Sequence, residues 1–106
     1  MKTQIQSLGF DANRDLLNLI DKKLEKIGQL SDRILEGKVV LKIDKSDTRE
    51  NKICEIRLAI PGNDLFAKKM AESFEQAVDQ VMHALEKQVH DWKTKLHDRQ
   101  VKIVKE

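Results

Sequence analysis

The segment from Ser73 to His97 carries a stripe of side chains whose chemistry suits the binding of an anion. The stripe consists of His83, Lys87, His90, Thr94 and His97. These residues recur at intervals of three or four, so in a helix they share one side. Lysine and protonated histidine pair with phosphate and carboxylate groups. The stripe therefore predicts a docking surface for an anionic partner.

The histidines of this stripe do not form a metal site. His83, His90 and His97 are separated by two helical turns, which is about 10 Å along a helix axis. One metal ion cannot bridge that distance, so we interpret them as surface residues. The alternative is that they add positive charge to the stripe at mildly acidic pH.

The other reactive side chains do not indicate an enzyme. Cys54 is the only cysteine, which excludes an internal disulfide, and no acid or histidine is placed to activate it, so we expect a buried thiol. Asp44, Asp47 and Glu50 lie close together in sequence, but their spacing does not match a calcium loop. A glycine-rich phosphate loop and a nucleophile–base pair are both missing. The sequence therefore predicts a protein without catalytic activity, cofactor or small-molecule substrate.

Composition limits the class of protein further. A chain of 106 residues with 40% hydrophobic content suits one domain with a modest core. Aromatic residues make up only 4%, which argues against base stacking on aromatic side chains. The net charge of +2 is small, so any case for nucleic-acid binding depends on where the lysines lie. No apolar run approaches the roughly 20 residues that cross a bilayer, and the N-terminus lacks the apolar core of a signal peptide. We expect a cytoplasmic protein that makes no membrane contact, with a monomer favoured.

The first half of the chain reads as a strand followed by a helix. Residues 3–8 alternate weakly between polar and apolar types, which predicts a strand. Residues 13–29 carry apolar side chains at helical spacing, with Asp11 or Asn13 as candidate N-cap and Gly28 near the expected end. The apolar positions of this helix are Leu16, Leu17, Ile20, Leu24 and Ile27.

The second half reads as three strands and a long helix. Residues 38–45 and 53–60 alternate clearly, and the polar residues 46–51 between them predict a hairpin loop. Pro61 and Gly62 suit a type II turn before a fourth strand at residues 64–71, whose inward face the pattern leaves open. Ser73 is a candidate N-cap for the final helix. The apolar stripe of that helix is Phe74, Val78, Val81, Leu85, Val89, Trp92 and Leu96.

This order predicts an α+β fold of the type β-α-β-β-β-α, with two helices on one face of a four-stranded sheet. We expect one domain over residues 1–98 and a short, flexible C-terminal tail over residues 99–106. An edge strand at residues 101–104 is the alternative for the tail. We expect Trp92 to pack in the core rather than to stack on a base.

Several short motifs together resemble the family of ribosome hibernation promoting factors, which includes the ribosome-associated inhibitor and proteins labelled as sigma factor modulators. The motifs in the long helix are Ala-Val-Asp at 77–79, Leu-Glu-Lys-Gln-Val at 85–89, and Lys93, with Phe74 at the family's aromatic position. In the first helix, residues 22–27 (Lys-Lys-Leu-Glu-Lys-Ile) are similar to the family's Lys-Lys-Leu-x-Lys-Leu. The order of elements and the Pro-Gly turn agree as well. One departure is Ala84, which stands where the family often has lysine.

The resemblance implies a fold similar to double-stranded RNA-binding domains. It also implies that the partner is the small ribosomal subunit with its ribosomal RNA. Such proteins occupy the decoding channel and inhibit translation during stress or stationary phase. Long-form members carry an additional dimerisation domain after this one, so we expect the short form here. The alternative function is a protein-interaction regulator of a transcription (sigma) factor, as the older label suggests.

The resemblance also implies which residues bind RNA, by backbone and shape contacts rather than by reading bases. The expected contacts on the helices are Lys22, Lys23, Lys26, Lys87, Lys93 and Lys95, with His90 beside them. Weaker candidates in the strands are Lys42, Lys68 and Lys69. For any one of these lysines, an ordinary solvated side chain is an equally good interpretation. The hypothesis concerns the group: the outward sides of both helices would form one cationic surface.

Overall fold

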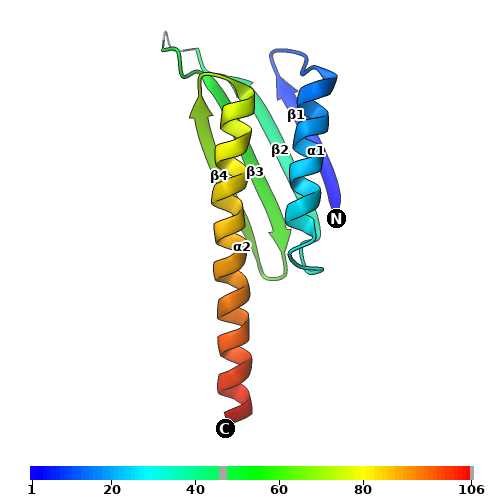
Figure 1. Cartoon of the computed structure of the whole chain (residues 1–106), viewed down its shortest axis with the longest axis vertical. Helices are drawn as coiled ribbons and strands as arrows, with labels where there is room; N and C mark the ends of the chain where they lie inside the picture. The colour runs from blue at the N-terminus through cyan, green and yellow to red at the C-terminus, as the bar shows by residue number, and fades with distance from the viewer. Residues whose placement is uncertain (46–47, 106) are drawn as a thin grey trace.

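The computed structural model describes the backbone of residues 1–45 and 48–105 and the side chains of residues 1–45 and 48–96. Its elements follow the order β-α-β-β-β-α (Figure 1). They are β1 (Lys2–Leu8), α1 (Arg14–Gly28), β2 (Glu36–Ile43), β3 (Lys52–Ile60), β4 (Asn63–Ala71) and α2 (Phe74–Lys105). The predicted fold class is therefore confirmed.

The four strands form one sheet in sequence order, β1-β2-β3-β4. The pair β1–β2 is parallel, because α1 connects them and returns the chain to the end of the sheet at which β1 begins. The pairs β2–β3 and β3–β4 are antiparallel. Each antiparallel pair is joined by a hairpin. At the β3–β4 hairpin, Gly62 has a φ of 81°, the positive value that a type II turn requires after Pro61. The sheet is thus mixed, with β1 and β4 as its two edges.

Both helices lie on the same face of the sheet and run in the same direction along it (Figure 1). Among the residues whose side chains are described, every buried side chain between the helices and the sheet is apolar, and the largest fully buried ones include Ile20, Leu24, Leu41, Ile56, Leu58 and Leu85. The other side of the sheet is not covered by any described element (Figure 1). We call this second side the bare face. Strand residues therefore alternate between the core and the bare face.

Side-chain caps fix where the helices begin. The Asn13 side chain accepts a hydrogen bond from the Leu16 amide at 2.8 Å, so Asn13 rather than Asp11 is the N-cap of α1. The Ser73 hydroxyl accepts from the Gln76 amide at 3.1 Å, which confirms Ser73 as the cap of α2. These two caps fix the first residue of each helix, and so fix where the apolar side of each helix begins along the sheet.

The structure also settles the inward face of β4. Ala67 and Ala71 are buried against α2, whereas Phe66 and Met70 are 40% and 43% exposed on the bare face. Small side chains are needed on the inward face because α2 packs directly on this strand. The alternation alone could not show this, since both faces of β4 carry apolar residues.

The C-terminal part of α2 runs past the end of the sheet, and the molecule measures 57 × 25 × 18 Å (Figure 1). The helical backbone continues to Lys105, so the stretch 101–104 is helical and does not form an edge strand. The flexibility expected for residues 99–106 stays a prediction. Two residues of the predicted hairpin loop, at 46 and 47, lie outside the described residues.

A pair of matched substitutions tests the position of the core. Leu85 is fully buried between α2 and the sheet, whereas Leu35 is 60% exposed. We expect Leu85→Ala to lower the free energy of unfolding by about 2–5 kcal/mol, because it leaves a cavity. Leu35→Ala should change it by less than about 0.5 kcal/mol. Urea unfolding followed by circular dichroism measures both, and equal losses would contradict the fold.

Candidate nucleic-acid interface

The solvent-facing sides of α1 and α2 form one surface, which we call the helix face. Two contacts hold the helices side by side. The Lys23 ammonium donates a hydrogen bond to the Asp79 carboxylate at 2.8 Å, and the Lys93 ammonium donates to the Leu30 carbonyl at 2.7 Å. Both contacts join residues far apart in sequence. Two of the predicted RNA contacts therefore also tie the helices together.

The three lysines of α1 lie on one side of that helix. Lys22 and Lys26 are exposed, and they are four residues apart, so they lie one above the other. The Lys23 side chain is 30% exposed, because it turns toward Asp79 on α2. Lys22, Lys23 and Lys26 share a shallow hollow of about 420 Å³ with Leu19, Glu25 and Gln29. The grouping of these three lysines, which the sequence predicted, is present.

The predicted residues of α2 fall on three different lines along the helix. Seven-residue spacing places Asp79, Glu86 and Lys93 on the side toward α1, since Asp79 pairs with Lys23 of α1 and Lys93 bonds to Leu30, two residues beyond the end of α1. His83, Lys87, His90 and Thr94 are exposed and lie on the neighbouring outward side. Gln88 and Lys95 lie on the side toward β4, where the Gln88 amide donates to the Phe66 carbonyl at 2.8 Å. Lys93 and Lys95 therefore point to opposite flanks of α2.

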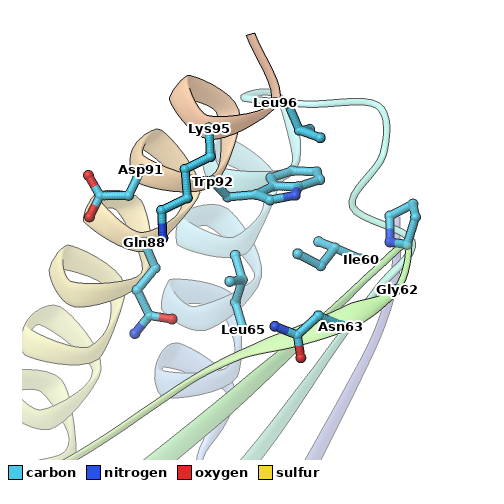
Figure 2. A pocket seen from close by; sticks show the side chains of 10 residues that line it. Ile60, Gly62, Asn63, Leu65, Gln88, Asp91, Trp92, Lys95 and Leu96 are labelled. Carbon is cyan, nitrogen blue, oxygen red and sulfur yellow. The ribbon is translucent and has the colours of Figure 1, made fainter. Parts of the chain in front are cut away.

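Lys95 belongs to a groove beside the β3–β4 turn rather than to the seam between the helices. Figure 2 shows the Trp92 indole reaching from α2 toward this turn, above Leu65 and Ile60, with Lys95 at the rim. The groove encloses about 600 Å³, and its walls combine apolar side chains such as Leu65 and Trp92 with polar ones such as Asn63 and Asp91. Trp92 packs against the core cluster, as expected. The six helix lysines thus do not all face the same way.

Charge is distributed unevenly along the helix face. Residues 74–86 of α2 include Glu75, Asp79 and Glu86 but no lysine or arginine, whereas residues 87–96 include three lysines and one aspartate. In α1, the lysines lie in the half nearer the C-terminus. Because both helices run in the same direction, their cationic halves lie toward the same end of the molecule (Figure 1). Residues 21–28 and 87–96 together carry six lysines and three acids, a net charge of +3, whereas residues 14–20 and 74–86 carry one arginine and four acids, a net charge of −3.

The strand candidates lie elsewhere. Lys42 and Lys68 have their side chains on the bare face, because their cross-strand neighbours alternate away from the core. The Lys42 ammonium is 2.6 Å from the Glu55 carboxylate. Lys69 is on the side of the sheet that α2 covers, at the edge, and shares a shallow hollow with His83. The structure therefore brings only Lys69 near the helix face.

The sequence reasoning missed two features of charge. Asp79 was not predicted as the partner of Lys23, although they are the residues that connect the helices. Lys38, Arg57 and Phe66 form a cross-strand row on the bare face, and the Arg57 guanidinium lies over the Phe66 ring at 5.2 Å from its centroid. The alternation of β2 and β3 indicates that Lys38 and Arg57 lie on the face opposite the core. Only the register between β3 and β4 shows that Phe66 lies beside them.

Two further findings concern the described part of the chain. Within residues 1–45 and 48–96, no cluster of three or more histidine, cysteine or acidic side chains could hold a metal ion. The described helices include none that is both long and apolar enough to cross a membrane.

Comparisons with known proteins agree with the geometry. Residues 3–97 match the family described as Sigma 54 modulation protein / S30EA ribosomal protein, which confirms the resemblance seen in the sequence. A ribosomal subunit interface protein from Coxiella burnetii superposes with a TM-score of 0.78 at 28% identity, over 89% of this chain and 99% of that one. The N-terminal domain of Protein Y from Thermus thermophilus superposes with a TM-score of 0.74, over 87% of this chain and 99% of that one; at 22% identity this shows the fold alone. No curated protein matches the chain.

The pKa of Asp79 tests the seam between the helices. The hydrogen bond from Lys23 and its charge lower the pKa of the Asp79 carboxyl below 3.8. The contribution of this pair to stability is therefore present at neutral pH and is lost as pH falls through that lowered pKa. We expect Lys23→Met to raise the pKa of Asp79 toward its ordinary value, in an NMR titration. Lys22→Met, which removes a neighbouring charge without that bond, should change it much less, and equal changes would contradict the contact.

Cys54 provides a second test. Burial, with a smaller effect from the charge of Glu55, raises the pKa of the Cys54 thiol from 9.0 to about 12. At pH 8 the thiolate fraction should be roughly a thousandfold smaller than for a free thiol, because each pKa unit is a factor of ten. We expect iodoacetamide to label the native protein very slowly and the urea-unfolded protein rapidly. Rapid labelling in native buffer would show that the thiol is accessible.

Proposed function

Since the chain belongs to the family described as Sigma 54 modulation protein / S30EA ribosomal protein, we propose that it is a ribosome-binding factor. The extent of the family match carries the proposal, because residues 3–97 include every strand, α1 and most of α2. The similarity to a protein named for the ribosomal subunit interface supports the same partner.

The partner surface is ribosomal RNA, and the cationic end of the helix face makes the contact. Lys22, Lys26, Lys87 and Lys93 are all exposed there, and His90 lies beside them. Phosphate neutralisation by lysine releases counterions, which favours binding without any reading of base sequence. The mixed charge of the rest of the protein limits contact to this end.

The biological role that fits this contact is ribosome hibernation. The domain would occupy the decoding channel of the small subunit, exclude messenger and transfer RNA, and so inhibit translation during stress or stationary phase. Such a role requires shape and charge but no chemical step, and it takes place in the cytoplasm with the protein as a monomer.

A protein-interaction role toward a sigma factor is the second candidate, because the family description itself includes sigma 54 modulation. The acidic half of the helix face, with Glu75 and Asp79, could contact a basic protein. The two roles differ in their sensitivity to nuclease. A complex with a transcription factor survives RNA digestion, whereas retention by ribosomal RNA does not.

Sedimentation with purified small subunits tests the proposal. We expect the protein to pellet with the subunits and the retained fraction to fall steeply with salt. The double variant Lys26→Glu/Lys87→Glu should raise the dissociation constant by roughly tenfold or more, and should reduce the salt slope by about 2, because each lysine is expected to contact one phosphate. Both side chains are exposed, so the fold should be kept.

The matched control is Arg14→Glu/Lys45→Glu, which makes the same change in net charge at the opposite end of the molecule (Figure 1). We expect this control to pellet nearly as the parent protein does. Equal losses in both double variants would mean that total charge, not the cationic end of the helix face, governs binding. No pelleting of the parent at any salt concentration would rule out the ribosome as partner.

A further inference from the structure

The bare face of the sheet carries an unusual combination of side chains for an unoccupied surface. All four strands carry basic residues on it: Lys2 on β1, Lys38 and Lys42 on β2, Arg57 on β3 and Lys68 on β4. Three acids share this face, Glu36, Glu55 and Asp64, of which Glu55 pairs with Lys42 and Asp64 with Arg57. Apolar side chains lie among them, and three of these are 40% or more exposed: Leu8, Phe66 and Met70. An exposed apolar area rimmed by charged side chains is typical of a binding surface.

One part of this face is shaped to hold a planar group. Cross-strand pairing places Lys38, Arg57 and Phe66 in one row across β2, β3 and β4, with Val40 and Glu55 in the next row. These five residues line a hollow of about 180 Å³. That is smaller than the roughly 300–1,000 Å³ of pockets for drug-sized ligands. The hollow therefore suits a single ring system inserted from a longer ligand.

The groups around the hollow have the chemistry of base recognition. The Arg57 guanidinium carbon lies over the Phe66 ring, 5.2 Å from its centroid, and the guanidinium is also 3.6 Å from the Asp64 carboxylate. Aromatic rings and guanidinium planes are the two side-chain groups on which unpaired bases stack. Within the described residues, Lys38 and Lys68 make no ion pair, so their charges are available to phosphates on either side.

Glu55 gives the hollow a preference among bases. Its carboxylate is oriented by Lys42, 2.6 Å away, and its side chain is 20% exposed at the edge of the hollow. A carboxylate accepts a hydrogen bond from the amino group of cytosine, whereas it repels the carbonyl oxygen that uracil has at the same position.

We propose that the bare face is a second RNA-binding surface, which takes single-stranded RNA with one base stacked in the hollow formed by Phe66, Arg57 and Lys38. Single-stranded RNA is favoured over an acidic peptide because the hollow is lined by two planar stacking groups and accepts only one ring. It is favoured over duplex RNA because the bases of a duplex are already stacked. This surface lies on the side of the sheet opposite the helix face, so the two can bind independently (Figure 1).

Fluorescence anisotropy of short labelled cytidylate and uridylate oligomers tests the proposal with the full chain. The measurements are made on the parent and in the Lys26→Glu/Lys87→Glu background, which weakens any contribution from the helix face. We expect cytidylate to bind more tightly than uridylate in both. In both proteins, Phe66→Ala should weaken cytidylate binding roughly tenfold, because it removes a stacking ring. Phe66→Trp should restore binding, and Lys38→Glu should reduce the salt slope by about 1 or more.

The matched control is Leu35→Ala, which shortens an exposed apolar side chain that precedes β2 and is not part of the bare face. It should bind as the parent does, and circular dichroism should show that every variant keeps the fold. Amide chemical shifts provide a second readout: Val40, Glu55 and Arg57 should move on titration with cytidylate. Shifts confined to α1 and α2, or equal affinity of the Phe66→Ala and parent proteins, would overturn the proposal.

Two other outcomes also count against it. Tight binding of an acidic peptide in the absence of any oligonucleotide binding would make the bare face a protein-docking surface. Equal affinity for cytidylate and uridylate would remove the role given to Glu55. No ribosome is present in these measurements, so their failure leaves the ribosome-binding proposal untouched. Loss of subunit pelleting in the helix variants likewise leaves this proposal standing.

Discussion

One-sided burial of the sheet is the constraint on which the structure depends. A four-stranded sheet with an apolar inner face must be covered, and the apolar stripes of α1 and α2 are the only described elements that cover it. Their docking fixes how each helix is rotated, and so decides which lysines face solvent. The same constraint leaves the other side of the sheet uncovered. The helix face and the bare face are therefore two consequences of one packing arrangement.

Rotation of the helices explains why residues of equal charge have different surroundings. Burial of Leu85 and Val89 directs Lys87 straight outward, Lys93 toward α1 and Lys95 toward the β3–β4 turn. Lysines spaced by two residues differ by about 200° around a helix, so a list of basic residues does not define a surface. The bond from Lys23 to Asp79 on α2 and the bond from Lys93 to Leu30, just beyond α1, further reduce the number of freely moving ammonium groups at the seam.

The fold could be predicted from the sequence because its signals are local. Alternation in β2 and β3, the apolar spacing of both helices, the Ser73 cap and the Pro61–Gly62 turn each required only neighbouring residues. The inward face of β4 could not, because α2 rather than the strand itself decides that Ala67 is buried and Phe66 exposed. For the same reason, composition argued against base stacking: it counts aromatic residues but cannot show that one ring lies open beside a guanidinium.

The uneven distribution of charge shows how a nearly neutral protein can have a strongly cationic end. Acidic side chains occupy the first turns of both helices, where Asp15 and Glu75 interact favourably with the positive end of the helix dipole. Because the helices are parallel, their acidic first halves lie toward one end of the molecule, and their second halves, which carry six lysines and three acids, lie toward the other (Figure 1). Each helix is stabilised by acids near its N-terminus. Because the two helices are packed in parallel, this preference produces a charge gradient along the whole domain. A polyanion close to this domain experiences the cationic end more strongly than the distant acidic end, because salt screens the latter over about 10 Å. The gradient therefore orients the protein before any specific contact forms.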